Sequence, residues 1–207
     1  MPSLTEQSTV LARMTGRIQW GDPVYRLLTE AGDRIGTVAA VGADPATGDW
    51  VLEVRDGEDQ VLAVVRRPTS GQSTDPAWRL LDPDGAELAR LRKRSRVIGR
   101  PRMQTSFTCG LAELARSSAD RPLDPWPIAD DAGRELVILT ALPGARPPGA
   151  DRRIALSAAG AADPRRTLAL ALAQLLCVYA IPPKDAGRQG RDSGWLAAIG
   201  DVLDIFN

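Results

Sequence analysis

A segment rich in arginine is the strongest candidate for recognition chemistry in this chain. Between positions 90 and 102 it has no acidic residue, and its arginines are Arg90, Arg92, Arg94, Arg96, Arg100 and Arg102. Side chains alternate between the two faces of an extended strand, so the first four would project from one face. A guanidinium offers a planar fork of donors to phosphate, and unbalanced positive charge concentrates anions. The segment therefore predicts a surface that binds an anionic phospholipid head group or an acidic protein.

Two other interpretations of this segment stay open. The arginines could be a solvated wall whose charges pair with acids on an adjacent strand, such as Glu53 or Glu87. Nucleic acid is the least favoured partner, because binders of single strands interleave aromatic side chains with their basic groove. No aromatic residue occurs between Arg90 and Arg102.

The sequence gives little support for catalysis or metal binding. The chain has no histidine, which removes the usual general base and the commonest ligand of transition metals. Its two cysteines, Cys109 and Cys177, are far apart in sequence. Asp82 and Asp84 resemble the start of a calcium loop, but the twelfth position of such a loop is Lys93 instead of glutamate. We therefore expect no enzyme, no catalytic residue, no metal and no cofactor.

Composition and the first residues point to a cytoplasmic protein. The 26 basic and 26 acidic residues cancel, so an anionic partner must be met by a local patch. The first ten residues contain Glu6 and lack the basic start and apolar stretch of a secretory signal. We expect no transmembrane segment, since no apolar run reaches the roughly 18 residues of a spanning helix.

The elements that would position the basic segment are β-hairpins. Four times, an aromatic residue is followed seven positions later by a glycine that precedes a new apolar run: Tyr25 to Gly32, Trp50 to Gly57, Trp78 to Gly85 and Trp126 to Gly133. Alternating apolar residues and acidic, glycine-bearing turns are typical of hairpins. Further strands are expected at Val10 to Trp20, Met103 to Thr108, Leu111 to Ala115 and Ile154 to Ser157, which gives about twelve in all.

One helix is expected after this β-rich body, over residues 164–181. Asp163 and Pro164 are typical of a helix start, and Pro182-Pro183 ends it. The helix has no polar stripe, so protein or lipid must enclose it. Its apolar stretch of about 15 residues would extend only about 22 Å, against about 30 Å for the hydrocarbon core. Burial inside the protein is therefore the favoured interpretation.

A second, amphipathic helix is expected at the C-terminus, after a linker that starts at residue 184. Within Ser193 to Phe206, the apolar residues of one face are Trp195, Ile199, Val202 and Phe206, opposite Asp201 and Asp204. This face could pack on the body of the protein or dock onto a protein partner. The second possibility gives an alternative function, a structural or assembly protein that acts through its tail.

The combination of aromatic-led hairpins and an apolar helix resembles the tubby C-terminal-like superfamily, which includes phospholipid scramblases and LURP-one-related proteins. The resemblance covers roughly residues 10–181 and depends on the stretches from Tyr25 to Gly32, Trp78 to Leu91 and Leu168 to Ala180. It implies a mainly β fold, a closed antiparallel barrel of about 12 strands around a central hydrophobic helix, within a domain of residues 1–183. It also implies a non-enzymatic binding or scaffold module that recognises anionic lipid head groups. The isolated cysteines differ from the acylated stretch of scramblases, so scrambling is not expected.

Overall fold

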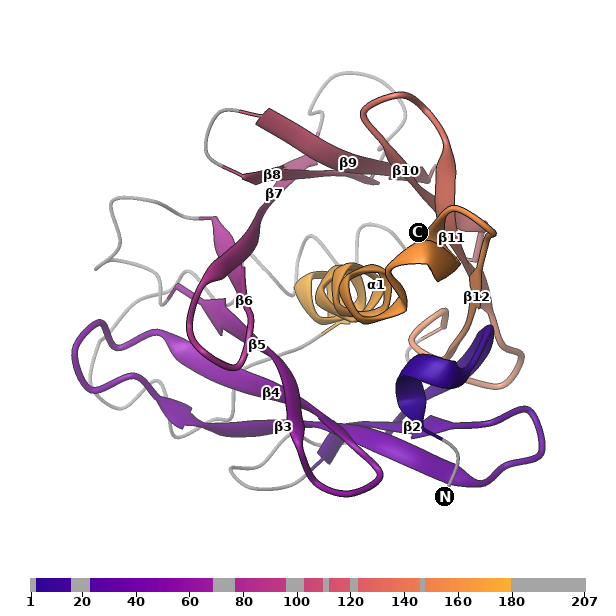
Figure 1. Ribbon diagram of the computed structural model, residues 1–207, viewed down its shortest axis with the longest axis horizontal. Coiled ribbons are helices and arrows are strands. Elements are labelled where there is room, and N and C mark those ends of the chain that lie inside the picture. The colour runs from indigo at the N-terminus through magenta and orange to yellow at the C-terminus, as the bar shows by residue number, and fades with distance from the viewer. Residues whose placement is uncertain are drawn as a thin grey trace.

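Twelve antiparallel strands form a closed barrel in the part of the chain that the structure describes (Figure 1). This computed structural model describes residues 3–15, 23–68, 77–95, 103–109, 112–119, 123–145 and 148–179. Each strand pairs with its neighbour along the chain, and β1 closes the barrel against β12. The strands are β1 (Thr9–Met14), β2 (Pro23–Leu28), β3 (Arg34–Ala43), β4 (Trp50–Asp56), β5 (Val61–Arg67), β6 (Trp78–Leu81), β7 (Glu87–Ser95), β8 (Met103–Cys109), β9 (Ala112–Ala119), β10 (Trp126–Asp130), β11 (Glu135–Ala141) and β12 (Arg152–Leu156). The mainly β class and the twelve-stranded barrel are therefore confirmed.

The alternation of side chains explains why these segments form a barrel wall. In β4, Trp50, Leu52 and Val54 are buried, and the residues between them are partly exposed. Such a strand has one apolar face to bury and one polar face for water. Closure of the barrel also pairs the backbone groups that an open sheet would leave exposed at its two edges.

Four hairpin turns share one backbone geometry. In each, the N–H of the first residue donates to the carbonyl of the residue four positions later, and the N–H of the fourth residue donates back to the carbonyl of the first. The side-chain oxygen of the first residue also accepts a hydrogen bond from the N–H of the fifth, over 2.7 to 3.1 Å. The first residues are Thr29, Asp56, Asp82 and Asp130. This explains why an oxygen-bearing side chain starts each turn.

The second of these turns is built differently from the sequence-based expectation. The left-handed conformation falls on the fourth residue of each turn, at Gly32, Asp59, Gly85 and Gly133, with φ of 94°, 65°, 87° and 80°. Gly57 was expected to reverse the chain, but Asp59 has the positive φ, two residues later. Asp tolerates this conformation better than most residues with a side chain, because its short polar group bonds locally.

Five of the antiparallel strand pairs contain a β-bulge near the start of their second strand. The ladder skips one residue in β3, β5, β7, β9 and β11, and each skipped residue is apolar. These residues are Ile35, Leu62, Leu88, Leu114 and Leu136, which we call the bulge collar. Since a bulge re-aims a side chain, the collar places apolar groups at the hairpin end of the barrel, and all five belong to the core or pack against it.

In the part of the chain that the structure describes, one α-helix, α1 (Pro164–Tyr179), follows the last strand. Pro164 occupies its first position, the Arg166 N–H donates to Asp163 Oδ1 over 3.1 Å, and the Thr167 N–H donates to the Asp163 carbonyl over 3.0 Å. The expected helix start is thus confirmed, whereas residues 180 and 181 lie outside the described part. Two short 3-10 helices, η1 (Leu4–Glu6) and η2 (Gly160–Ala162), lie near it.

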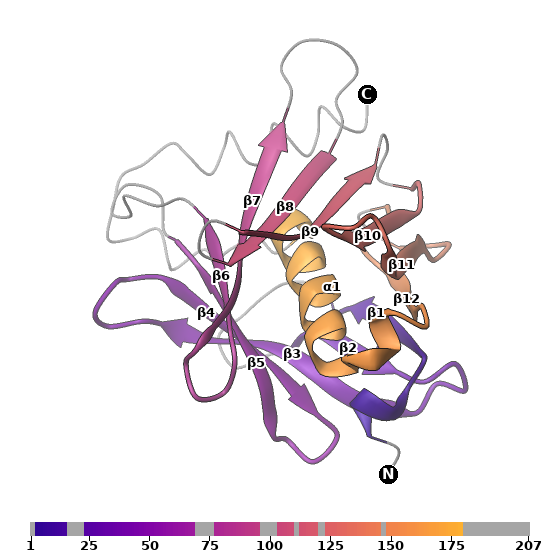
Figure 2. The ribbon, with the colours of Figure 1, turned by 45° about the horizontal axis from the view of Figure 1, so that its top comes forward.

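The helix is buried on every side along most of its length. Each residue from Thr167 to Leu176 exposes at most 3 % of its surface. The helix packs mainly against β5, β6, β7, β11 and β12, and Figures 1 and 2 draw its orange ribbon between β3–β6 and β10–β12. Among the described residues, no helix has the length and apolar character required to cross a bilayer.

Some boundaries differ from the sequence-based ones. The strand expected to end at Ala115 continues to Ala119, because Ser117 and Ser118 pair with Thr105 and Gln104 of β8. Polar residues in the wall of a barrel give no apolar alternation that would show this extension. The strand expected over residues 10–20 has its β1 portion at Thr9–Met14, and residues 16–22 lie outside the described part.

Candidate functional site

Arginines from four strands share the outer surface of the wall formed by β5 to β9. The register pairs Arg66 with Arg79 and Arg79 with Arg90, which places the three in one row across β5, β6 and β7. Two residues further along β7, Arg92 pairs with Ser106, and Ser106 pairs with Arg116 of β9. We call Arg66, Arg79, Arg90, Arg92 and Arg116 the basic face. Their neighbours Val65, Leu80, Leu91 and Ala115 are fully buried, so the arginines project outward.

Acidic side chains hold the row of three arginines in place. Arg66 pairs with Asp44, Arg79 Nη2 lies 3.1 Å from Asp49 Oδ2, and Arg90 Nε lies 2.7 Å from Glu87 Oε1. The pair with Glu87 supports the solvated-wall interpretation for Arg90. Glu53, the other expected partner, instead pairs with Arg55 of its own strand at 2.5 Å.

The loop that supplies Asp44 is itself ordered by hydrogen bonds. The backbone N–H of Ala46 donates to Asp44 Oδ1 over 2.8 Å. This bond, together with the charge of Arg66, lowers the pKa of Asp44 below its ordinary value and outweighs the opposing effect of burial. The carboxylate is therefore charged at neutral pH and holds one end of the arginine row.

Only part of the expected site lies in the described region. Arg90 and Arg92 are both on the outer surface, Arg92 being exposed. Arg94 lies within β7, where its backbone pairs with Gln104. The residues Arg96, Arg100, Arg102, Trp195, Ile199, Val202 and Phe206 lie outside the described residues.

The basic face also contains three arginines that the sequence-based site omits. Arg66, Arg79 and Arg116 are isolated from the arginine-rich segment in sequence, and only the pairing register brings them beside it. A signal existed in the hairpin pattern, since pairing Trp78–Leu81 with the return strand places Arg79 next to Arg90. The site is thus a surface across several strands rather than one strand.

A further arginine, Arg67, packs on two aromatic rings toward the opposite end from the hairpin turns. The Arg67 guanidinium carbon lies 5.7 Å from the centre of the Trp50 ring and 5.2 Å from that of Trp78. Burial lowers the pKa of Arg67. Contacts with the faces of two rings favour the cation there and offset part of its lost hydration.

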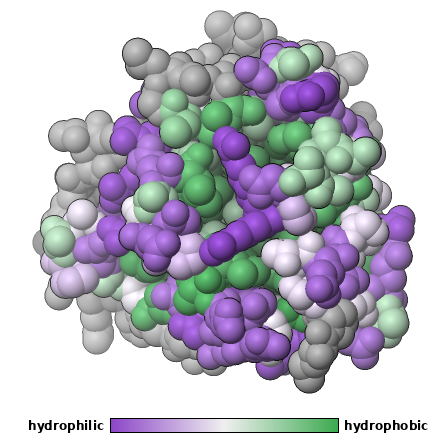
Figure 3. All heavy atoms as spheres, viewed as in Figure 1, coloured by the Kyte–Doolittle hydropathy of each residue, from purple (hydrophilic) through white to green (hydrophobic). Residues whose placement is uncertain are grey.

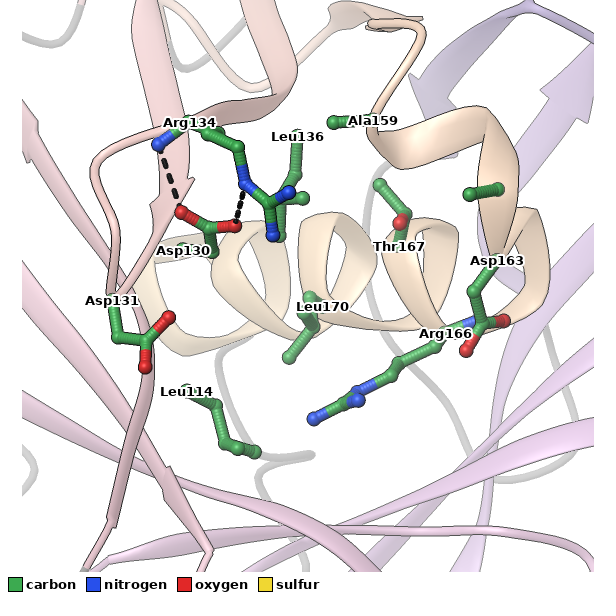
Figure 4. Close-up of a pocket in the computed structure, with 11 residues that line it drawn as sticks. Leu114, Asp130, Asp131, Arg134, Leu136, Ala159, Asp163, Arg166, Thr167 and Leu170 are labelled. Atoms are coloured by element: carbon green, nitrogen blue, oxygen red, sulfur yellow. Dashed lines mark hydrogen bonds and ion pairs between the residues drawn. The ribbon is translucent and has the colours of Figure 1, made fainter.

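A cleft opens at the hairpin end of the barrel, beside the N-terminus of α1. Its volume is about 330 Å³, and it lies among Leu114, the β10–β11 turn, the chain before α1 and the first turns of α1. Figure 3 shows apolar side chains gathered in the middle of this face around a strip of polar ones. Figure 4 shows the side chains that line the cleft, with Arg134 bonded to Asp130.

No family model matches the chain, and neither the curated proteins nor the solved structures compared with it give a match. Among the described residues, no group of three or more histidine, cysteine, aspartate or glutamate side chains is arranged to hold a metal ion.

Proposed function

We propose that this protein is a non-enzymatic binding module of the tubby-like type, which recognises an anionic lipid surface through its basic face. The observation that carries the proposal is the convergence of Arg66, Arg79, Arg90, Arg92 and Arg116 on one wall. An anionic leaflet attracts basic residues near it by about 1 kcal/mol for each one. For a protein in the cytoplasm, the inner leaflet is the nearest such surface.

In a tubby-like fold, α1 would run through the barrel and fill its lumen. Its burial on all sides and its packing against β5–β7 and β11–β12 support this role. A barrel of twelve strands has a lumen wide enough to need filling, and a helix without a polar stripe leaves few polar groups unsatisfied there. A rigid, filled barrel would hold the outer arginines in a fixed arrangement.

The ion pairs of the arginine row contribute more to positioning side chains for recognition than to the stability of the fold. Pairs between partly exposed charges contribute little to folding, yet they restrict long side chains to defined positions. Asp44, Asp49 and Glu87 pair with Arg66, Arg79 and Arg90. Arg92 and Arg116 are exposed on the same wall, on β7 and β9. We expect Arg92 and Arg116, together with the rest of the arginine-rich segment, to contact the phosphates.

Vesicle pelleting tests this function. The wild-type protein should pellet with vesicles of phosphatidylcholine and phosphatidylserine, and not with phosphatidylcholine alone. Replacing Arg92, Arg94 and Arg96 by serine should abolish pelleting and leave the thermal midpoint nearly unchanged. Pelleting that survives in this variant, or equal pelleting with neutral vesicles, would refute the proposal; binding to acidic proteins alone would point to a different partner.

A further inference from the structure

The cleft at the hairpin end has the volume of a small-molecule site. Its volume of about 330 Å³ falls in the range of ligand pockets, about 300 to 1,000 Å³. The cleft lies between α1 and the part of the wall formed by β9 to β11, because Leu114, Asp130 and Leu136 line it together with Leu170 of α1. The cleft is separate from the basic face, which lies on the outer wall.

Two β-bulges build the apolar floor of this cleft. Leu114 of β9 and Leu136 of β11 are both residues that the ladder skips, and both line the cleft together with Leu170 of α1. In a regular ladder, each would follow the alternation of its strand. The bulges instead direct these side chains toward the helix, where they present an apolar surface.

Two of the carboxylates around the floor already have hydrogen-bond partners. Asp130 accepts hydrogen bonds from the Arg134 N–H and Nε, both over 2.8 Å. Asp163 caps α1 by accepting the Arg166 N–H. Both carboxylates therefore have partners, while Asp131 is exposed at the rim.

Arg166 supplies the positive charge over the floor. Figure 4 shows its guanidinium extending past Leu170 toward Leu114. Within the described part of the chain, this guanidinium makes no ion pair and no hydrogen bond.

We propose that this cleft binds a small amphipathic carboxylate, a medium-chain fatty acid in its chemistry. The carboxylate pairs with the Arg166 guanidinium, and the aliphatic chain covers Leu114, Leu136 and Leu170. This site goes beyond the binding of a lipid surface by the basic face and does not depend on it.

Calorimetric titration with octanoate, 1-octanol and octylamine tests the site. Octanoate should bind with a stoichiometry of one, and more tightly than the alcohol or the amine. Arg166→Gln should weaken octanoate binding about tenfold or more, as expected for the loss of a charge-assisted hydrogen bond. Arg165→Gln is the matched control, because Arg165 is the adjacent residue but its Nε donates to the Leu62 carbonyl of β5 over 3.1 Å.

A second variant tests the cleft without removing a charge. Ala162 is exposed and lines the cleft, so Ala162→Leu should fill part of the cleft and weaken octanoate binding while the fold is retained. Absence of saturable octanoate binding to the wild type, equal weakening by Arg165→Gln, or tighter binding of octylamine would each overturn the proposal. Octanoate should not displace the protein from anionic vesicles, so the proposals for the cleft and for the basic face can be tested independently.

Discussion

The guanidinium carbon of Arg152 lies 3.9 Å from the centre of the Trp126 ring, although Arg152 is fully buried. Its Nε donates to the Gly149 carbonyl over 2.8 Å, and its Nη1 donates to the carbonyls of Asp124 and Leu139 over 3.0 and 3.2 Å. The Trp126 ring in turn stacks on Tyr179 of α1, with centres 5.9 Å apart. Arg152 therefore links the last strand, a loop and the end of the helix.

Replacing Arg152 by lysine should destabilise the protein by about 2 to 4 kcal/mol, because an ammonium group cannot reproduce a fork of donors to three carbonyls. Urea denaturation measures this change. Arg153→Lys is the control, since Arg153 and its partner Glu30 are both exposed, and it should cost less than about 1 kcal/mol. Equal costs for the two variants would contradict the role assigned to Arg152.

Two buried tyrosines should respond in opposite directions to replacement by phenylalanine. The Tyr25 hydroxyl has no hydrogen-bond partner among the described residues, whereas the Tyr179 hydroxyl donates to the Pro148 carbonyl over 3.2 Å. Tyr25→Phe should thus stabilise the protein by about 1 kcal/mol, and Tyr179→Phe should destabilise it by about as much. Urea denaturation of both variants checks the signs.

Alkaline pH should also distinguish Tyr25. Burial raises the pKa of Tyr25 above its ordinary value of 10.0. The unfolded chain then loses this proton at lower pH than the folded protein, so the stability associated with Tyr25 falls as the pH rises above 10.0. The stability lost between about pH 9 and about pH 11 should be smaller in Tyr25→Phe than in the wild type. An identical loss would show that Tyr25 does not titrate in this way.

The turn geometry predicts unequal effects at two glycines. Gly133 has a φ of +80°, so Gly133→Ala should cost about 1 to 2 kcal/mol. Gly57 has no positive φ, and a Cβ there would lie 3.5 Å from the Ile35 carbonyl oxygen, an ordinary contact. Gly57→Ala should change the free energy of unfolding by less than about 0.5 kcal/mol. A larger cost at Gly57 than at Gly133 would mean that the second hairpin turns at Gly57.

Acid should weaken the turn that starts at Asp130. Burial alone would raise the pKa of Asp130, but hydrogen bonds from the Arg134 N–H and guanidinium lower it below 3.8. A lowered pKa contributes stability at neutral pH that is lost as the pH falls through and below the ordinary aspartate range. The stability difference between the wild type and Asp130→Asn should therefore shrink below about pH 4, as measured by urea denaturation at a series of pH values. A difference that stays constant into acid would contradict this assignment.

Local signals made the hairpins predictable. Strand alternation and oxygen-bearing turn residues act within about ten positions, so they can be read for Tyr25 to Gly32 or Trp126 to Gly133. The second hairpin is an exception. Asp56-Gly57 is a strong turn signal, yet the turn extends to Asp59, which has the positive φ. As in the other three turns, the residue with positive φ precedes the bulge residue, here Leu62, by three positions.

Long-range register was harder to predict. The β6–β7 hairpin could have placed Arg79 beside Arg90, but nothing near Arg116 indicates that it lies on the same wall as Arg92, because that depends on the pairing of β7, β8 and β9. The cleft likewise arises from Leu114 and Leu136, which only bulges direct toward α1. The arginine-rich segment was visible in sequence, but its neighbours were set by the ladder.

Binding of charge-matched variants to anionic vesicles tests the central claim most directly. Arg92→Ser combined with Arg116→Ser removes two charges from the basic face, and Arg13→Ser combined with Arg153→Ser removes two from the wall formed by β1 and β12. The account predicts that the first pair weakens binding to phosphatidylserine vesicles by about 20- to 30-fold, since each arginine contributes about 1 kcal/mol, while the second pair has much less effect. Equal weakening by the two pairs would contradict the account, because net charge alone would then explain the binding.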